Sequence, residues 1–308
     1  MKKLHIIFFW YIFAVGSFAR LQAQNQYHIS LFGIHQPFGN VAAIGSYEYI
    51  NGAFFHKSQW VGVKNAPNFQ GFDFSLPLPK NNSLGVSLLR DQINVHQQYD
   101  LALNYAYNLR LKKDYFMSFG LAPVIVFRQS LFNRLSLQNP EDPLFQNTRL
   151  LVMPNLRLGL YFYGPRFYVS LSTNRFLHNT LSKENKALTN FNGKEIHLQL
   201  SGGYEFALHK NLDLDISTIL RYVYGAPLSA DFRVQFLIYK FVGLGVAYRT
   251  NNDLYGSILV QVYKNIKLAY AFGWNFVAIR RASKGDHEVM LLWAIPKEKK
   301  TKVVIPRF

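Results

Sequence analysis

Cysteine is absent from the 308 residues, and the chain holds no second long apolar run after the one at its amino terminus. Without cysteine there is neither a disulfide framework nor a cysteine for lipid attachment. After residue 19 no stretch approaches 18 continuous apolar residues, and no helical period of hydrophobic residues is visible, which excludes a bundle of membrane-spanning helices. Packing, strand pairing or a membrane must therefore stabilise the fold.

Acidic residues are also scarce, with 17 Asp and Glu against 34 Lys and Arg and a net charge of +17. The first 23 residues read as an export signal: Lys2 and Lys3 precede an apolar region over 4–19, and Ala23 offers a cleavage site before Gln24. An uncleaved anchor is the alternative, but 16 residues are slightly short for a membrane span. Removing Lys2, Lys3 and Arg20 with the signal leaves a net charge of +14. Because an exported chain rarely meets nucleic acid, we expect anionic outer-membrane lipid, and no nucleic acid, as the partner of this charge.

What is abundant is strict alternation of apolar and polar residues. In 72–89, Phe72, Phe74 and Leu76 share one parity, and the pattern resumes after the turn Pro-Lys-Asn-Asn, as in a β-hairpin with one apolar face. About fourteen segments of this kind follow one another: 52–61, 68–78, 83–91, 97–109, 115–127, 154–163, 165–173, 194–206, 211–224, 227–239, 241–250, 254–263, 265–274 and 285–295.

The connections between these segments alternate too. Every second one is short, and the longest, near 128–153 and 174–193, are all among the others. The apolar parity repeatedly ends in aromatic residues such as Tyr222 and Trp274, whereas the opposite parity carries acids, Arg, Gly, Ala and Ser. A soluble two-sheet sandwich is possible. The pattern favours an all-β, transmembrane antiparallel barrel of about 14 strands, with short periplasmic turns, long extracellular loops and a polar lumen.

Four stretches in series give a more specific indication. They are "SQWVGVKNAPNFQGFDFSLPLPKNNSLGVSLLRDQI", "MPNLRLGLYFYGPRFYVSLSTNRFL", "LRYVYGAPLSADF" and "GDHEVML". In this order and spacing they resemble the PorP/SprF family of type IX secretion outer-membrane proteins, over most of residues 45–295. The matching positions include Gln59, Trp60, Gly62, Pro67, Pro154, Asn155, Arg166, Gly225, Pro227, Asp231, His287 and Glu288. Within residues 33–46, Gln36-Pro37-Phe38 is at best a degenerate counterpart of the family's Asn-Pro-Ala-Tyr-Ala-Gly-like segment.

The resemblance implies a non-enzymatic part in type IX secretion. It implies export or surface retention of cargo, such as adhesins that carry a C-terminal signal domain, and contact with periplasmic or outer-membrane components of the machinery. Gliding motility is a further link that the family suggests. The alternatives are a porin or small-solute transporter and an outer-membrane enzyme, but no convincing Ser/His or Asp/His group is visible for the latter.

Candidate chemical sites are weak, and we expect no cofactor, metal or catalytic residue. In a strand, Asp286 and Glu288 point away from His287, so the three cannot converge on a metal ion. The charged residues on the polar parity of two neighbouring strands are read as lumen salt bridges: Asp213, Asp215, Arg221, Asp231 and Arg233.

Four regions are expected along the chain: a signal peptide over 1–23, a periplasmic segment over 24–50, the barrel over 51–295 and a basic periplasmic tail over 296–308. The tail combines an apolar Val-Val-Ile-Pro stretch with five cations. It is either a solvated extension or a docking peptide for a periplasmic partner. The candidate docking residues are Lys297, Lys299, Lys300, Lys302 and Arg307.

Overall fold

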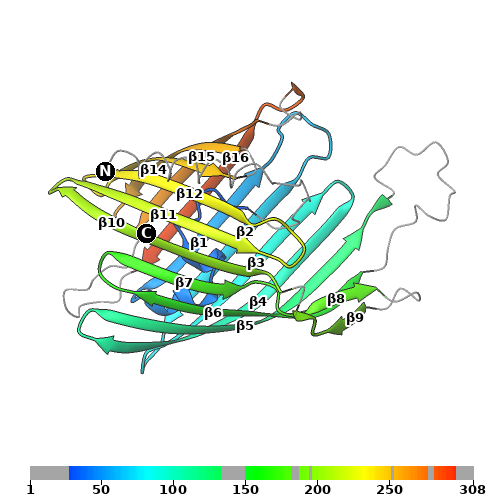
Figure 1. Cartoon of the computed structure of the whole chain (residues 1–308), viewed down its shortest axis with the longest axis horizontal. Helices are drawn as coiled ribbons and strands as arrows, with labels where there is room; N and C mark the ends of the chain where they lie inside the picture. The colour runs from blue at the N-terminus through cyan, green and yellow to red at the C-terminus, as the bar shows by residue number, and fades with distance from the viewer. Residues whose placement is uncertain are drawn as a thin grey trace, which may run out of the picture.

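The computed structural model describes residues 28–132, 150–181, 187–193, 196–250, 253–276 and 281–295. Within them, fourteen antiparallel strands close into one barrel (Figure 1). In chain order they are β1 Ile50–Ser58, β2 Asn68–Pro77, β3 Asn82–Ile93, β4 His96–Lys112, β5 Tyr115–Ser130, β6 Leu151–Tyr163, β7 Phe167–Thr173, β10 Leu198–His209, β11 Leu212–Tyr222, β12 Ser229–Ile238, β13 Val242–Arg249, β14 Asp253–Tyr263, β15 Ile266–Asn275 and β16 Asp286–Ile295.

The first and last strands close the barrel. β1 pairs with β16 in a register that runs from Ile50 opposite Ile295 to Ser58 opposite His287. Closure leaves no unpaired strand edge, which is what a sheet inside a bilayer requires. The fourteen expected strands are all present and differ only at their ends. The structure adds a small separate hairpin, β8 His178–Leu181 with β9 Ala187–Asn190, within the long connection after β7.

Alternation along each strand separates a lipid-facing from an inward face, as the sequence predicts. In β4, Leu103 is 57% exposed on the outside, whereas its neighbour Asn104 is 2% exposed and points inward. The same division holds along β12, where Phe232 and Val234 are exposed and Asp231 and Arg233 are buried. None of the helical turns in the described ranges is long and apolar enough to cross a membrane.

The two ends of the barrel differ. Short turns connect β2 to β3, β4 to β5, β6 to β7, β10 to β11, β12 to β13 and β14 to β15, and Ile50 and Ile295 lie at this same end. We call it the short-turn end, and the opposite one the long-loop end. In outer-membrane barrels the short turns face the periplasm.

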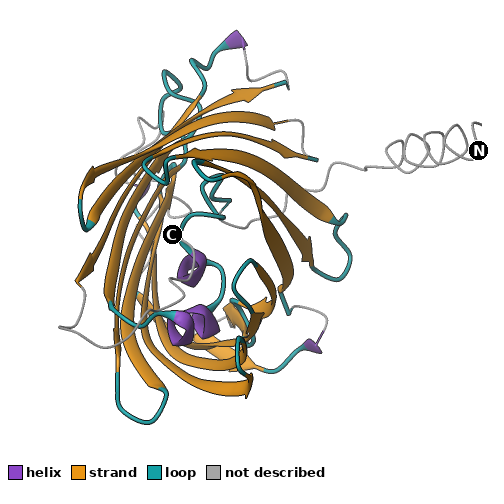
Figure 2. Cartoon of the chain, turned by 90° about the vertical axis from the view of Figure 1, so that its left-hand side faces the viewer, coloured by secondary structure: helices purple, strands orange, loops and turns teal. Residues whose placement is uncertain are grey.

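Residues 28–47, which we call the lumen segment, lie inside the barrel. The expected placement of residues 24–50 in the periplasm is therefore wrong for 28–47. The segment holds two 3-10 helices, η2 Gln36–Phe38 and η3 Val41–Ser46, and Figure 2 shows such helices within the ring of strands. Every residue of η3 is buried. The physical reason is visible in the sequence: residues 28–47 contain no Asp, Glu, Lys or Arg and are rich in Ile, Leu, Phe, Val and Ala. In the periplasm these apolar side chains would be exposed to water.

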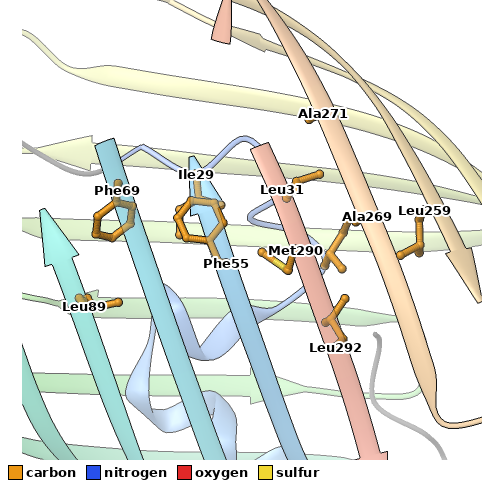
Figure 3. Packing of buried hydrophobic residues seen from close by; sticks show 11 residues of the cluster. Ile29, Leu31, Phe55, Phe69, Leu89, Leu259, Ala269, Ala271, Met290 and Leu292 are labelled. Atoms are coloured by element: carbon orange, nitrogen blue, oxygen red, sulfur yellow. The ribbon is translucent and has the colours of Figure 1, made fainter. Parts of the chain in front are cut away.

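The apolar core lies between this segment and the barrel wall. Ile29 and Leu31 pack against inward side chains of the strands around the closure point (Figure 3), and Ile34 belongs to the same cluster. Those wall residues are Phe55, Phe69, Leu89, Leu259, Ala269, Ala271, Met290 and Leu292. Further along, Val41 packs on Ala122 and Met153. The barrel thus has a packed interior over this part of its lumen, built by its own amino-terminal chain.

Candidate functional site: a lumen closed by the amino-terminal segment

One buried carboxylate holds the lumen segment near the long-loop end. Glu288, on β16, is fully buried and accepts hydrogen bonds from the Ser30 hydroxyl at 2.6 Å and the Ser30 amide at 2.9 Å. The Leu31 amide donates to the same carboxylate at 3.3 Å. Lys57 Nζ on β1 lies 2.7 Å from the other carboxylate oxygen. Four donors therefore converge on Glu288, and two of the residues that supply them belong to the lumen segment.

Lys57 extends this anchor. Its ammonium group donates to the His28 carbonyl oxygen at 2.8 Å and to the Tyr255 hydroxyl at 3.3 Å. Tyr255 in turn donates to Asp286 at 3.0 Å. A buried ion pair contributes little net stability, but removing one partner leaves an uncompensated charge and costs about 3–5 kcal/mol. The anchor is therefore a point where one substitution can release the segment.

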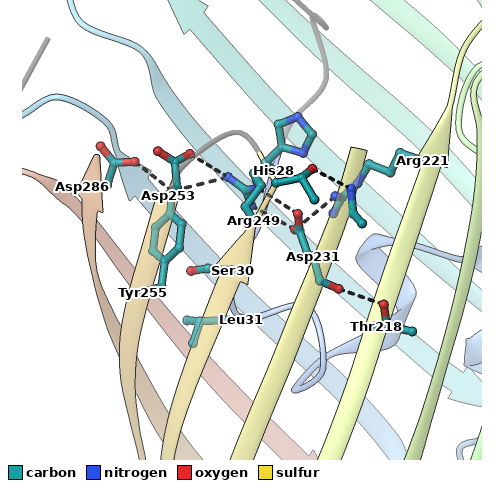
Figure 4. A network of polar contacts seen from close by, with 12 residues as sticks. His28, Ser30, Leu31, Thr218, Arg221, Asp231, Arg249, Asp253, Tyr255 and Asp286 are labelled. Atoms are coloured by element: carbon teal, nitrogen blue, oxygen red, sulfur yellow. Dashed lines mark hydrogen bonds and ion pairs between the residues drawn. The ribbon is translucent and has the colours of Figure 1, made fainter. Parts of the chain in front are cut away.

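A second charged group lines the wall on β11, β12 and β13 (Figure 4). Asp231 accepts hydrogen bonds from Nε and Nη2 of Arg249, at 2.9 and 3.1 Å, and lies 3.0 Å from Arg221. On the same strands Arg233 lies 3.5 Å from Asp215. The expected lumen salt bridges are confirmed for Asp215, Arg221, Asp231 and Arg233. Asp213 is buried on the same inward face.

The part of the lumen segment near the short-turn end is held by neutral hydrogen bonds. The Asn40 side-chain amide donates to the Leu160 carbonyl at 2.9 Å and to the Ser170 hydroxyl at 2.6 Å, while its oxygen caps η3 by accepting from Ala42 at 2.8 Å. Ser172 and Gln199 both donate to the Gly39 carbonyl oxygen.

Two wall glycines allow this close approach. A Cβ atom at Gly120 would lie 2.5 Å from the Ala42 Cα, and one at Gly159 would overlap the Asn40 side chain. Only glycine leaves room for η3 at these two positions.

Between the two ends, a buried histidine links the segment to the first strands. His35 Nε2 lies 3.1 Å from Asp73 Oδ1, and the other oxygen of Asp73 accepts from Ser87 at 2.7 Å. Asn104 donates to Ser87 at 2.5 Å and completes this buried group across β2, β3 and β4.

The family-signature positions do not form one cluster. Those of the β1–β2 loop organise its backbone. The Gln59 backbone N–H donates to the Pro67 carbonyl oxygen, and the Trp60 backbone N–H donates to the Asp286 carboxylate at 2.9 Å. Gly62 takes the left-handed φ of 97° that this loop requires. These positions shape the long-loop end beside the Glu288 anchor.

The mid-barrel positions act separately. Asn155 is buried, and its side chain fastens the chain after β7 by accepting from Phe176 and Leu177 and donating to Leu177. Pro154 sits in β6 opposite Ile125, and the Arg166 carbonyl accepts from Glu205.

The remaining signature positions fall on the last third of the chain. Gly225, with φ of 77°, and Pro227 lie in the β11–β12 loop. His287 faces outward and hydrogen-bonds Tyr270 at 2.8 Å, which confirms that it points away from Asp286 and Glu288. Of the signature set, only Asp231 and Glu288 belong to the buried charged groups.

The predicted signal peptide over 1–23 and the candidate docking residues of the tail lie outside the described residues. Over the ranges that are described, no group of three or more His, Asp or Glu residues is placed to hold a metal ion.

Sequence reasoning missed Ser30, Asn40, Lys57 and Asp73. Lys57 and Asp73 carry a usable signal, since each is the one charged residue among the inward-facing positions of its strand.

The chain resembles known proteins in its sequence family and in its fold. The family described as "Type IX secretion system membrane protein PorP/SprF" matches residues 21–293. No curated protein matches the sequence.

Among solved structures, the CymD monoaromatic hydrocarbon channel superposes with a TM-score of 0.53 at 11% identity, covering 90% of this chain and 96% of that one. The Ralstonia pickettii toluene transporter TbuX gives 0.48 at 9% identity, covering 83% and 92%. The fold is that of an outer-membrane barrel, and the chain belongs to the PorP/SprF family of type IX secretion membrane proteins.

Proposed function

We propose that this outer-membrane barrel supports the export or surface retention of cargo proteins, such as adhesins that carry a C-terminal signal domain. Its part is non-enzymatic, with gliding motility as one process that it serves. Membership of a type IX secretion family supports this role. The observation that carries it is the lumen segment, whose residues from Ile29 to Pro37 and from Asn40 to Tyr47 are buried. A barrel filled in this way is suited to hold partners at its ends and rims.

The competing function is a porin or small-solute transporter. A passive pore needs an open lumen lined by water, whereas the described part of this lumen holds a packed apolar cluster and buried ion pairs. The likeness to hydrocarbon channels shows the fold alone, because the sequences share only 11% identity or less. The filled lumen therefore favours the secretion role.

The contact with the machinery is assigned to the basic tail. β16 ends with Ile295 at the short-turn end, so the chain leaves the barrel on the side that faces the periplasm in proteins of this kind. Lys297, Lys299, Lys300, Lys302 and Arg307 attract an acidic partner at long range, and the adjoining Val-Val-Ile-Pro stretch adds short-range affinity.

Three strains test the role: wild type, one lacking 297–308 and one lacking the whole chain. We expect the full deletion to lose one or a few cargo proteins from the surface and culture-fluid proteomes, and the tail deletion to reproduce this loss with the barrel still assembled. Unchanged secretion in the full deletion, together with slower uptake of a small solute, would establish the porin. Secretion lost only in the full deletion would keep the role and reject the tail as its docking site.

A disulfide lock tests whether the lumen must open. A Cβ atom at Gly45 would lie 3.2 Å from Ser118 Cβ, close to the 3.5–4.5 Å of a disulfide. Because the chain has no cysteine, Gly45→Cys with Ser118→Cys forms a single defined bond. We expect the oxidised double variant to secrete cargo like its reduced form, and each single variant serves as a control. Loss of secretion on oxidation alone would show that the segment has to move.

A further inference from the structure

A small cavity lies between the lumen segment and the wall. It has a volume of about 60 Å³, and one side is apolar, formed by Ile29, Phe38 and Ile219 among others. Its polar side combines Gln36 of the segment with Arg157 of β6 and Arg221 of β11. The cavity therefore touches both the plugging chain and two distant strands of the barrel.

The polar side of the cavity has buried donors that lack acceptors. Gln36 Nε2 and Arg157 Nε have no hydrogen-bond partner, in side chains that are 6–7% exposed. Arg221 Nη1 lies 3.0 Å from the Asp231 carboxylate, which it shares with Arg249. A buried donor without an acceptor costs about 1–3 kcal/mol. Two such donors at one cavity, beside a guanidinium group that shares its carboxylate partner, point to an acceptor that binds there.

The charge of the lining selects an anion. Arg157, Arg175 and Arg221 face the cavity, whereas Asp100 is its one acidic residue. Asp100 lies 3.4 Å from Arg157, so it offsets part of that charge only. Burial and the neighbouring Arg175 lower the pKa of the lining residue His197 to about 4, so His197 is neutral at pH 7. Three guanidinium groups and one carboxylate group thus line the cavity.

The size and the apolar side restrict the anion further. Since one water needs about 10–15 Å³ of such volume, the cavity holds roughly four to six waters, or an organic molecule of similar size. A carboxylate accepts two or more hydrogen bonds from guanidinium and amide donors. Its short hydrocarbon stem would lie against Ile29, Phe38 and Ile219.

A second cavity lies next to the first, toward the long-loop end. It has a volume of about 210 Å³, shares Arg175 and His197 with the first, and is lined also by Gln98, Arg128 and Asn155. Gln98, Arg128 and Asn155 lie close to the strand ends that face the long loops. Its polar, cationic lining is suited to attract an anion toward the inner cavity.

We propose that the inner cavity binds a small organic carboxylate with a short apolar stem, which bridges Gln36 of the lumen segment to Arg157 and Arg221 of the wall. The bound anion stabilises the segment in its place, because a ligand that binds only the closed state lowers the population of the open one. This site is independent of the secretion role and of the tail.

Calorimetric titration of the purified protein with butyrate tests the site, with butan-1-ol as a neutral probe of the same chain length. We expect saturable binding of butyrate and none of butan-1-ol, and chloride at equal ionic strength must not compete. Equal binding of both probes, or displacement of butyrate by chloride, would overturn the proposal.

Two variants make the test specific. Gln36→Leu removes a donor from the cavity and should weaken butyrate binding about tenfold or more. Gln235→Leu removes an equally buried donor without a partner, from a residue that does not line the cavity, and should leave binding unchanged. A closed barrel resists unfolding in detergent until it is boiled. A difference in gel mobility between the unheated and the boiled sample therefore checks that each variant is folded. Unaltered butyrate affinity in Gln36→Leu would refute the site.

A second measurement tests whether the bound anion holds the lumen segment in place. Leu31 is fully buried in the lumen segment, and the chain contains no cysteine. The single thiol of Leu31→Cys can react with a maleimide only when the segment opens, so the reaction rate reports opening. Saturating butyrate should slow this reaction, whereas butan-1-ol should not. Labelling that is equally fast with and without butyrate would mean that the anion does not hold the segment.

Discussion

The barrel wall and the lumen segment are stabilised in different ways. Each wall strand is paired along both edges, with registers that extend over six to fourteen residue pairs. The segment has no place in that ladder: its apolar side chains pack against the wall, and its polar anchors are a few side chains, chiefly Glu288, Asp73, Ser170 and Ser172. Such side-chain contacts can open locally without breaking the backbone hydrogen bonds of the strands. The segment is therefore the part of this molecule that single substitutions can release while the wall stays closed.

The two ends of the segment also differ from each other. Near the long-loop end a fully buried ion pair holds Ser30 and Leu31, whereas near the short-turn end neutral hydrogen bonds and two glycines hold Asn40 and η3. A buried charge is costly when it loses its partner, and a neutral hydrogen bond much less so. The ends should thus respond to substitution by very different amounts.

The largest effect is expected for Glu288→Gln. The variant leaves the Lys57 ammonium buried without its counter-charge, which costs about 3–5 kcal/mol. If that cost falls on the closed state of the segment, the labelling rate of Leu31→Cys rises about a hundred- to several-thousandfold.

A wall carboxylate supplies the control for this experiment. Asp253 lies 3.6 Å from Arg249 and accepts from Asn275, both on the wall. Asp253→Asn should leave the Leu31→Cys rate within a few-fold of the parent. Equal acceleration by both variants would show that wall and segment open as one unit.

The next largest effect separates the two faces of the wall. Leu103→Arg places a charge in the lipid, at about 2–4 kcal/mol near the midplane, and should reduce the fraction of protein that shows the mobility shift on boiling. Asn104→Arg places the same charge inside, where the Asn104 amide lies 3.4 Å from Asp73. It should assemble far better. Equal assembly of the two variants would contradict the division into faces.

The difference between wall and segment also explains what the sequence could reveal. Alternation predicted all fourteen strands and the inward position of residues such as Asp231 and Arg233, because each strand must satisfy lipid on one side and a polar interior on the other. Residues 28–47 have no such period, since they contact protein on all sides. Their lack of charge is the available signal, and the expectation of a periplasmic segment over 24–50 does not use it.

The contacts within the lumen were beyond prediction for a related reason. Parity shows that Glu288 and Lys57 point inward, but not that Ser30, more than 250 residues away in sequence, donates to Glu288. Such pairs depend on the path of the segment through the barrel. The positions that resemble the family therefore include Glu288 without indicating its partner.

The smallest effect is expected at Asn40, and it decides whether the two ends of the segment are coupled. Asn40→Ala removes the cap of η3 together with the bonds to Leu160 and Ser170, and loss of a cap costs about 0.5–2 kcal/mol. A second reporter, Ile44→Cys, sits in η3 at a buried position. Its labelling should accelerate about two- to thirtyfold, and Asn40→Ser, which keeps an acceptor for Ala42, should recover part of the loss.

The comparison of the two reporters then separates two mechanisms. If the ends open independently, Glu288→Gln accelerates Leu31→Cys and spares Ile44→Cys, whereas Asn40→Ala does the reverse. If the segment leaves the lumen as a whole, both reporters respond to both variants by the same factor, because a single open state exposes them together. The buried contacts at both ends and the packed cluster between them favour independent opening, since release of one end leaves the other still anchored. Equal factors at the two reporters would refute this and show that the lumen segment moves as one rigid plug.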